Sequence, residues 1–288
     1  MNHNSRFVVD MQVTGKCNLT CDFCDGAPKE YAGVPFDNIL AGIDKLVEAG
    51  LTTLNVSGGE PLVRKDTPKI LAYARGKGLE VYLSTNGFLL DRFFDEVAPH
   101  ITTLGLPLDG STPEVNASMT RGNEQFDITL SFLRKFKTDI PHFTVKVGTV
   151  ISAINIHDIP NIATVLFDNA SIYPPDVWRV YEFTPLGDGY FSKHRHTIMT
   201  EEFERVVNHV RGIYPNRVIS PLSNADSNDS YIFIDPRLMV QIYTNDNYYT
   251  VGNLIDLSIK DIINLKNDYS AVISKGGNNR IWLSTRGT

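Results

Sequence analysis

The sequence contains very few cysteines: three in 288 residues, Cys17, Cys21 and Cys24, all within the segment CNLTCDFC. An odd number of closely spaced cysteines does not suit a disulfide framework, which needs pairs of cysteines in a secreted domain. Reduced thiols fit a reducing compartment, so we expect a cytoplasmic protein.

Long apolar runs and an excess of basic residues are also missing. No stretch approaches the ~18 apolar residues of a membrane-spanning helix, and the N-terminal MNHNSRF is too polar for a secretory signal. The formal net charge of -6 and the pI of about 5.6 argue against general attraction to nucleic acid or to anionic membranes. We therefore expect neither a membrane nor bulk nucleic acid as a partner.

The chain has no low-complexity linker, and its only repeat is an alternation of short β-rich runs with helical patterns. This alternation is typical of parallel βα construction, and 42% hydrophobic residues suffice for one sizeable core. Strands are predicted at residues 7–14, 52–57, 80–85, 101–108, 143–151 and 178–184.

Two helices have recognisable ends. Residues 36–50 carry apolar side chains at three- and four-residue steps, and Gly50 is the expected C-cap. Residues 200–210 begin with Thr200 as an N-cap candidate, but Phe203 stands where a capping box needs Glu or Gln.

The loops that follow the predicted strands carry the polar residues of interest. The cysteine segment follows the first strand, SGGEP (57–61) the second, STNG (84–87) the third, LDG (108–110) the fourth and PLGDG (185–189) the sixth. In parallel βα sheets and barrels the active site lies at the carboxyl ends of the strands. We therefore expect these loops to meet at one mouth.

The cysteine triplet allows two kinds of site. Thiolates are soft ligands, and three of them can bind three irons of a [4Fe–4S] cluster and leave the fourth iron open to a small molecule. Three thiolates and one further ligand can also bind zinc as a tetrahedron.

Taken together, CNLTCDFC, SGGEP and STNG resemble the radical S-adenosylmethionine (SAM) superfamily over about residues 7–215. The resemblance implies an α/β fold, a partial (β/α)6 TIM-type barrel, with one [4Fe–4S] cluster and SAM as cofactors. It also implies an oxidoreductase or lyase that cleaves SAM to a 5′-deoxyadenosyl radical, which takes a hydrogen atom from the substrate. A reductant such as flavodoxin or ferredoxin is the implied protein partner.

The resemblance assigns roles to individual residues. Cys17, Cys21 and Cys24 would ligate the cluster, and Glu60 of the GGE element would receive the methionine ammonium. The other implied SAM contacts are Phe23, Gly58, Gly59, Ser84, Asn86, Thr149, Val150, Tyr181 and Phe183. Asp109 either caps the helix that follows it or contacts SAM or substrate.

The segment after the sixth strand holds the candidates for substrate chemistry. Lys193, His194, Arg195 and His196 form either a solvated run or, if the loop folds over the mouth, an anion pocket in which Arg195 and His196 bind phosphate or carboxylate. Because no cysteine is spare, a tyrosine such as Tyr190 would have to donate a hydrogen atom if a donor is needed.

Residues 216–288 are expected to form a C-terminal extension packed on the barrel of residues 1–215: a β-hairpin over 230–243 and a short helix over 257–265. The extension resembles SPASM or twitch regions, but it has no cysteine and therefore no auxiliary cluster. Its order after the sixth strand is also similar to viperin-like enzymes, which act on nucleoside triphosphates.

Three functions remain open at this point. The first is a radical SAM enzyme acting on a small polar or phosphorylated, nucleotide-like molecule, which the basic segment 193–196 favours. The second is a radical SAM maturase of a ribosomally made peptide, which an exposed sheet edge would favour. The third is a non-catalytic iron–sulfur or zinc binding protein.

Overall fold

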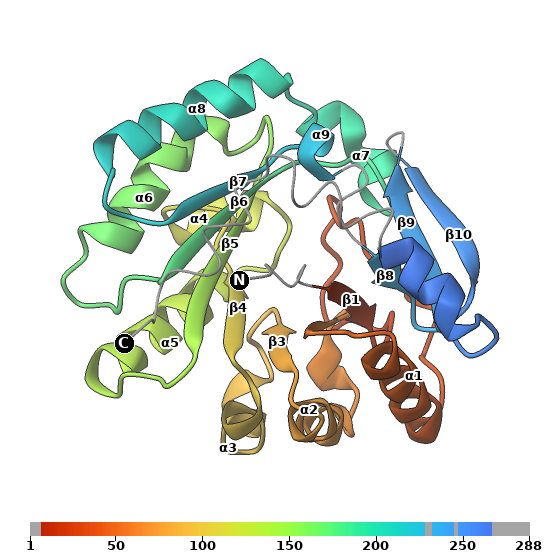
Figure 1. The fold of residues 1–288 in the computed structure, drawn as a ribbon. Helices are drawn as coiled ribbons and strands as arrows, with labels where there is room; N and C mark the ends of the chain where they lie inside the picture. Colours follow the sequence, from red (N-terminus) through yellow and green to blue (C-terminus); the bar gives the residue numbers. More distant parts are fainter. Residues whose placement is uncertain (1–6, 228–231, 245–246, 267–288) are drawn as a thin grey trace, which may run out of the picture.

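One curved sheet of ten strands forms the centre of the computed structural model, which describes residues 7–227, 232–244 and 247–266. The strand order is β10-β9-β8-β1-β2-β3-β4-β5-β6-β7, so the sheet has two ends and is not closed. Helices surround its convex side (Figure 1). The prediction of an open, partial barrel is confirmed.

All six predicted strands are present, and adjacent strands pair in parallel. They are β1 (Val8–Gln12), β2 (Thr53–Ser57), β3 (Glu80–Ser84), β4 (Thr103–Pro107), β5 (Thr144–Ile151) and β6 (Val177–Glu182). The helices are α1 (Phe36–Glu48), α2 (Thr67–Gly76), α3 (Leu90–Val97), α4 (Pro113–Ser118), α5 (Gln125–Thr138), α6 (Ile159–Phe167), α7 (Gly189–His196), α8 (Thr200–Ile213) and α9 (Asn224–Ser227). Short 3-10 turns occupy Pro61–Val63, Ala98–His100 and Ile156–Asp158.

Helix α1 ends with Ala49 as its C-cap, so the expected Gly50 occupies the next position instead. Gly50 has a φ of +87°, and its N–H donates to Val47 O at 2.9 Å. Leu51 N donates to Leu46 O at 2.9 Å, which completes a Schellman motif. The left-handed conformation favours glycine at this position.

Helix α8 begins one residue earlier than expected. Its N-cap is Met199, and Glu202 Oε2 accepts a hydrogen bond from Met199 N at 3.0 Å. The expectation of Thr200 as N-cap was wrong, because the Thr200 hydroxyl donates instead to Glu182 Oε1 at 2.8 Å.

The face of the sheet that contacts the helices is aliphatic. It carries Val9, Met11, Leu54, Val56, Val81, Leu83, Leu104, Leu106, Val145 and Val147, all of them buried. These side chains share one core cluster with Ile39, Ile43 and Leu46 of α1. Alternation along each strand sends every second side chain to this face.

The opposite, concave face is polar, and strand pairing aligns its side chains across the sheet. Asp10 pairs with Asn55, which pairs with Tyr82, and Ser57 lies on the same face one step further along β2. On the other half of the sheet, Lys146 of β5 occupies this face. We call this polar surface the inner face. In a closed barrel the interior would instead be filled by bulky apolar residues.

Both ends of the sheet extend beyond the six predicted strands. At one end β7 (Ile219–Leu222) pairs in parallel with β6, a strand that we did not predict. At the other end β8 (Ile232–Ile234) pairs in parallel with β1 and in antiparallel with β9 (Met239–Thr244). Strand β10 (Asn247–Asn253) completes that side. The extension therefore continues the barrel sheet through hydrogen bonds, and the division at residue 215 falls inside one sheet.

The expected hairpin and helix of the extension are present where the structure describes them. Strands β8 and β9 form the hairpin, and residues 259–266 are helical. Residues 230–231 of the predicted hairpin lie outside the described residues, as do residues 267–288 of the predicted extension.

Candidate functional site

The cysteine loop, residues 13–26, follows β1 at the carboxyl end of the parallel strands. Cys21 is buried, whereas Cys17 and Cys24 are partly exposed, and all three thiols are free. Backbone donors approach two of the sulfurs: Leu19 N lies 3.3 Å from Cys17 Sγ, and Gly26 N lies 3.4 Å from Cys24 Sγ. N–H groups aimed at sulfur favour a thiolate ligand.

The three sulfurs are suited to a cluster rather than to a single ion. Among the residues that the structure describes, no group of three or more Cys, His, Asp or Glu side chains converges on one metal position. A [4Fe–4S] cluster binds each thiolate through a different iron, so its ligands need not converge on one point. The donor set therefore fits the cluster better than a mononuclear zinc site. Burial raises the pKa of the Cys24 thiol to about 12, so metal binding is what would hold it as thiolate.

The paired glycines of SGGE lie directly against the cysteine loop. Gly59 N donates to Thr14 O at 2.7 Å, and Glu60 N donates to Lys16 O at 2.9 Å. A Cβ at Gly59 would overlap the carbonyl oxygens of Gly15 and Lys16. Glycine is required here because two backbones approach closely.

Glu60 connects the loop after β2 to the loop after β3. Its carboxylate is fully buried and accepts hydrogen bonds from Thr85 Oγ1 at 2.8 Å, Asn86 N at 2.7 Å and Leu62 N at 3.0 Å. Burial raises the pKa of Glu60, and these three donors oppose that shift. In this structure the carboxylate fixes loop geometry, so its implied contact with an ammonium stays a prediction.

Asn86 extends the same connection to the cysteines. Its amide nitrogen donates to Asn18 Oδ1 at 2.8 Å and lies 3.9 Å from Cys17 Sγ. Three loops that are far apart in the sequence thus share one hydrogen-bond network around the first cysteine. Asn86 was expected as a SAM contact, which stays a prediction, whereas Asn18 carried no signal of its own.

Ser84 belongs to a polar network on the inner face. Its hydroxyl donates to Asn55 Oδ1 at 3.0 Å, and Asn55 and Ser57 both donate to the Asp10 carboxylate through short hydrogen bonds. Burial raises the pKa of Asp10, while Ser57, Asn55 and the charge of Lys146 act against the shift. The charge of Lys146 therefore acts on the Asp10 carboxylate across the concave side of the sheet.

The other half of the inner face is basic and aromatic. Lys146 Nζ lies 3.5 Å from the hydroxyl of Tyr181. The guanidinium of Arg179 lies 5.8 Å from the centre of the Tyr181 ring and donates to Ser220 Oγ at 2.5 Å. Tyr181 was a predicted site residue, whereas Lys146 and Arg179 were not.

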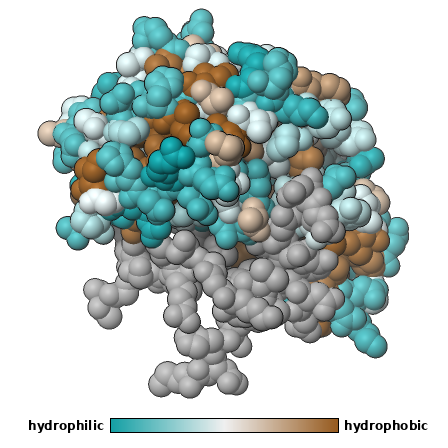
Figure 2. All heavy atoms as spheres, turned by 90° about the horizontal axis from the view of Figure 1, so that it is seen from above, coloured by the Kyte–Doolittle hydropathy of each residue, from teal (hydrophilic) through white to brown (hydrophobic). Residues whose placement is uncertain are grey.

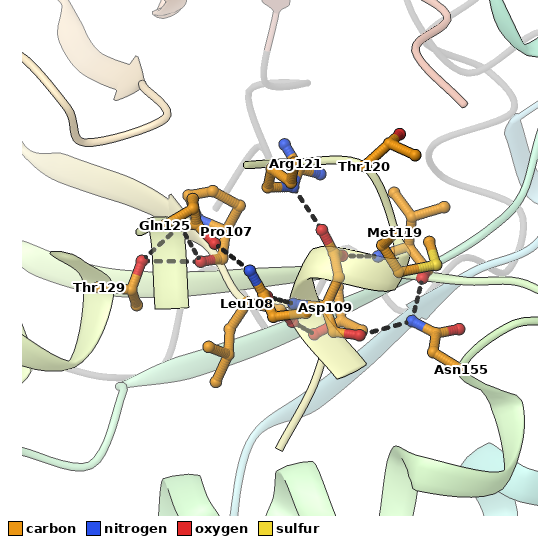
Figure 3. Close-up of polar contacts among 12 residues, drawn as sticks. Pro107, Leu108, Asp109, Met119, Thr120, Arg121, Gln125, Thr129 and Asn155 are labelled. Atoms are coloured by element: carbon orange, nitrogen blue, oxygen red, sulfur yellow. Dashed lines mark hydrogen bonds and ion pairs between the residues drawn. The ribbon is translucent and has the colours of Figure 1, made fainter. Parts of the chain in front are cut away.

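The carboxyl ends of β4 and β5 are held together by Asp109 (Figure 3). Its carboxylate accepts a hydrogen bond from Val150 N at 2.8 Å and forms an ion pair with Arg121. Asn155 Nδ2 donates to Asp109 O at 2.9 Å. The alternative that Asp109 caps the next helix was wrong, since Thr112 is the N-cap of α4.

The remaining predicted SAM contacts differ in their surroundings. Phe23 is buried, with the Arg121 guanidinium 4.8 Å from its ring centre on one side and the His196 ring 5.9 Å away. Thr149 faces the core, where its hydroxyl accepts from Trp178 Nε1 at 2.8 Å. Phe183 N already donates to Ile151 O at 3.1 Å. Phe23 belongs to the cysteine loop, and Val150 packs against the cluster that contains Phe23 and Cys21. The contact of each with SAM stays a prediction.

The basic segment 193–196 is the last turn of α7 rather than an irregular loop. Arg195 forms an ion pair with Asp22, and His196 Nε2 lies 3.0 Å from Asp22 Oδ1. The Ser192 hydroxyl donates to Asp22 O at 2.6 Å. We call these contacts the α7 clamp, because they hold the helix on the cysteine loop between Cys21 and Phe23. Both proposed anion-binding side chains thus already face a carboxylate.

His196 is fully buried between Phe23 and the Phe183 ring, whose centre is 5.2 Å away. Burial lowers the pKa of His196, while Asp22 acts in the opposite direction. Its other ring nitrogen lies 3.3 Å from Ser152 Oγ. The surroundings of His196 are those of a residue that positions the loop.

Tyr190 lies away from the inner face. Its side chain is 54% exposed at the start of α7, beside Phe191 and Lys193. A different tyrosine, Tyr248 of β10, packs edge-on against Phe233 at 5.2 Å on the inner face. Burial raises the pKa of Tyr248, and the charges of Asp25 and Asp10 add to the shift. No sequence pattern distinguishes Tyr248 from the other tyrosines, because its position depends on how the extension joins β1.

On the face that Figure 2 shows, the apolar side chains of the described residues lie in several groups among hydrophilic ones. Within the part of the chain that the structure describes, no helix is both long and apolar enough to cross a membrane.

Comparison with protein families finds that the Radical SAM superfamily matches residues 11–166. This range begins in β1 and includes the cysteine loop, SGGE and STNG. It covers more than half of the 288 residues.

Among curated proteins, an S-adenosylmethionine-dependent nucleotide dehydratase of Lacinutrix mariniflava is 24% identical over 93% of this chain and 57% of its own length. A protein of the same name from Psychrobacter lutiphocae is 23% identical over 91% of each chain. The chain spans 40% to 57% of the first three curated relatives that it matches. Among solved structures, Streptococcus suis SuiB bound to precursor peptide SuiA covers 93% of this chain, and 67% of SuiB is covered, with a TM-score of 0.73 at 14% identity.

Proposed function

This chain belongs to the radical SAM superfamily, and we propose that it cleaves SAM reductively and removes a hydrogen atom from a small phosphorylated substrate on the inner face. The cofactors of the family are SAM and an iron–sulfur cluster, and Cys17, Cys21 and Cys24 would hold a single [4Fe–4S] cluster. When bound, the two cofactors supply a 5′-deoxyadenosyl radical. The protein supplies position and exclusion of water.

The observation that carries the substrate class is the polar inner face with Lys146 and Arg179 on neighbouring strands. A concave sheet lined by Asn55, Ser57 and Lys146 is unsuited to an apolar substrate, because each of these groups would lose hydrogen bonds to water. Lysine and arginine are the side chains that bind phosphate. Two relatives that align over most of this chain carry the name nucleotide dehydratase, which agrees with a phosphorylated substrate.

The substrate would lie in one orientation. Asp10 stands on the β1 side of the inner face and Lys146 on the β5 side. A phosphate is attracted to Lys146 and repelled by the Asp10 carboxylate, whereas hydroxyl or amino groups donate well to Asp10. We therefore place the anionic end at β5 and β6 and the hydroxyl-bearing end at β1.

SAM would occupy the carboxyl ends of the strands. Phe23 of the cysteine loop and Val150, which packs against it, would contact the adenine. Glu60, Ser84 and Asn86 would shape the side nearer to β2 and β3. The enzyme would receive electrons from a flavodoxin or ferredoxin. We assign it to the cytoplasm, where thiols stay reduced.

A peptide substrate is the second candidate, and strand β10 favours it. This strand forms one end of the sheet, and its sequence NYYTVGN contains neither a charge nor a proline to block further pairing. Tyr249 and Val251 are 48% and 40% exposed along it. An extended peptide can add to such an edge as another strand.

The decisive experiment is SAM cleavage by the purified chain after anaerobic reconstitution with iron and sulfide. Reduced protein is incubated with SAM and, separately, with ATP, GTP, CTP or UTP, and 5′-deoxyadenosine is quantified by mass spectrometry. We expect one nucleotide to accelerate 5′-deoxyadenosine formation and to yield a changed nucleotide. The Cys21→Ala variant is expected to form none.

Two outcomes contradict the proposal in different ways. No 5′-deoxyadenosine above background from a fully loaded cluster would leave the non-catalytic alternative. Slow cleavage that none of the four nucleotides accelerates, together with acceleration by an extended peptide, would favour the second candidate.

A further inference from the structure

Arg121 lies beside the cysteine loop on the segment that follows α4, and this segment is fixed there by its neighbour Thr120. Asp22 N donates to Thr120 Oγ1 at 2.9 Å, and that hydroxyl donates to Asp22 Oδ1 at 2.7 Å. Thr120 has a φ of +58°, which is rare for a β-branched residue and strains the backbone. The surrounding contacts stabilise this strained backbone, which places the next side chain against the loop.

The guanidinium of Arg121 is held in one orientation. Its Nε donates to the Asp109 carboxylate, whose side chain is fully buried, and its Cζ lies 4.8 Å from the centre of the Phe23 ring. Figure 3 shows the ion pair at the end of β4, with the terminal nitrogens of Arg121 directed away from Asp109. A planar group that is ion-paired on one edge and stacked on one face has little freedom to move.

The positive charge of Arg121 reaches two of the three cysteines. Cys21 and Phe23 pack with Met119 in one apolar cluster, and Cys24 packs against it. The guanidinium on the Phe23 ring therefore lies beside the loop segment in which Cys21 and Cys24 flank Phe23. Within the described residues, the terminal nitrogens of Arg121 have no hydrogen-bond partner, and none of its atoms is both buried and unsatisfied.

We propose that Arg121 tunes the cluster site electrostatically: its fixed charge beside the cysteine loop stabilises the more negative, reduced state of a bound [4Fe–4S] cluster. One-electron reduction by an external donor adds one negative charge to the cluster. A cation held nearby lowers the free energy of that state, so the reduction potential rises. The proposal rests on the cluster assignment and not on the substrate.

The test is an EPR-monitored redox titration of the reconstituted protein without SAM or substrate. In Arg121→Gln the midpoint potential is expected to fall below that of the wild type, because the cation is lost. Arg121→Lys keeps the charge and should stay closer to the wild type. Asp109→Asn removes the anion of the same ion pair, whose charge opposes that of Arg121, so the midpoint potential of this variant is expected to rise.

Arg237→Gln is the matched control. Arg237 repeats the arrangement elsewhere, with an ion pair to Asp235 at 2.6 Å and its Cζ 4.1 Å from the centre of the Tyr31 ring. The midpoint potential of the Arg237→Gln protein should match that of the wild type. An Arg121→Gln protein with a full cluster and an unchanged midpoint overturns the proposal, as does a Lys variant that shifts as far as the Gln variant. If the Gln variant does not fold, an unchanged midpoint in Asp109→Asn overturns it equally. Because no substrate is present, failure here leaves the proposed function untouched.

Discussion

The two faces of the central sheet are built from the same strands but differ in almost every side chain. On the outer face, Leu54 and Val56 are fully buried against the helices. On the inner face of the same strand, Asn55 and Ser57 hydrogen-bond to Asp10 and stay partly accessible. A period of two separates these roles within single residue steps. On one strand, a position that packs in the core can therefore be changed independently of its neighbour on the polar inner face.

The largest expected effect is on the outer face. Leu54→Ala removes a fully buried side chain, and such truncations lower the free energy of unfolding by about 2–5 kcal/mol. Asn55→Ala, one residue away on the other face, should cost clearly less. Urea denaturation of the reconstituted proteins measures both. Equal losses would contradict the separation of the two faces.

A charge on the inner face should change binding more than stability. Lys146→Gln removes one charged donor, and a hydrogen bond to a charged group contributes about 1.5–3 kcal/mol, so affinity for the activating nucleotide should fall roughly 10- to 150-fold. Equilibrium dialysis with that nucleotide measures the change. Lys135→Gln, at an exposed position on α5, is the control and should bind like the wild type. Equal affinity in the two variants would remove Lys146 from the site.

The α7 clamp should show a smaller effect that belongs to neither face. Asp22→Asn loses its ion pair with Arg195 and its charge beside His196. Because Asp22 and Arg195 are partly exposed, we expect a loss of about 1 kcal/mol in unfolding free energy. Hydrogen exchange in residues 17–26 should accelerate. Unchanged exchange in this loop would show that α7 does not hold it.

The smallest effect is a pH dependence at His196. Burial lowers the pKa of His196 below its unfolded value, so the unfolded chain binds the proton more tightly. Stability from this group is present above the unfolded pKa of 6.5 and is lost as the pH falls through 6.5 toward the folded pKa. In His196→Gln, the thermal melting temperature should depend less on pH between about pH 7.5 and 5.5 than it does in the wild type. An unaltered slope would contradict a histidine that is buried neutral.

Much of the fold could be predicted because local signals agreed with each other. The six parallel strands alternate with helical segments. Because the cysteine loop, SGGE and STNG each follow a predicted strand, the three loops were expected at the same end of the sheet. Gly50 lies one position beyond its expected place at the end of α1, and a left-handed residue after a helix is a local property.

The polar inner face could have been predicted from the sequence, but it was not among the expectations. Asp10, Asn55, Tyr82 and Lys146 each interrupt an aliphatic strand at the period of two, whereas strands buried on both faces are nearly continuous in apolar residues. A polar concave surface was therefore encoded in single strands.

The contacts of α7 and of the extension could not be predicted from the sequence. Asp22, Thr120 and Arg195 are brought together from positions far apart in the chain, and no periodicity relates them. Strand β7 is short, and its pairing with β6 depends on the preceding helix α8 folding back over the sheet. Such features follow from tertiary packing, which overrides local preference.

The close approach of Gly59 to the carbonyls of Gly15 and Lys16 has a practical consequence for protein engineering. The two segments leave no room for even one methyl group between them, so they behave as a single rigid part. Transplanting residues 13–26 into another scaffold would therefore require residues 57–60 to be transplanted as well. Without them, the cysteine loop would lose the backbone segment against which it packs.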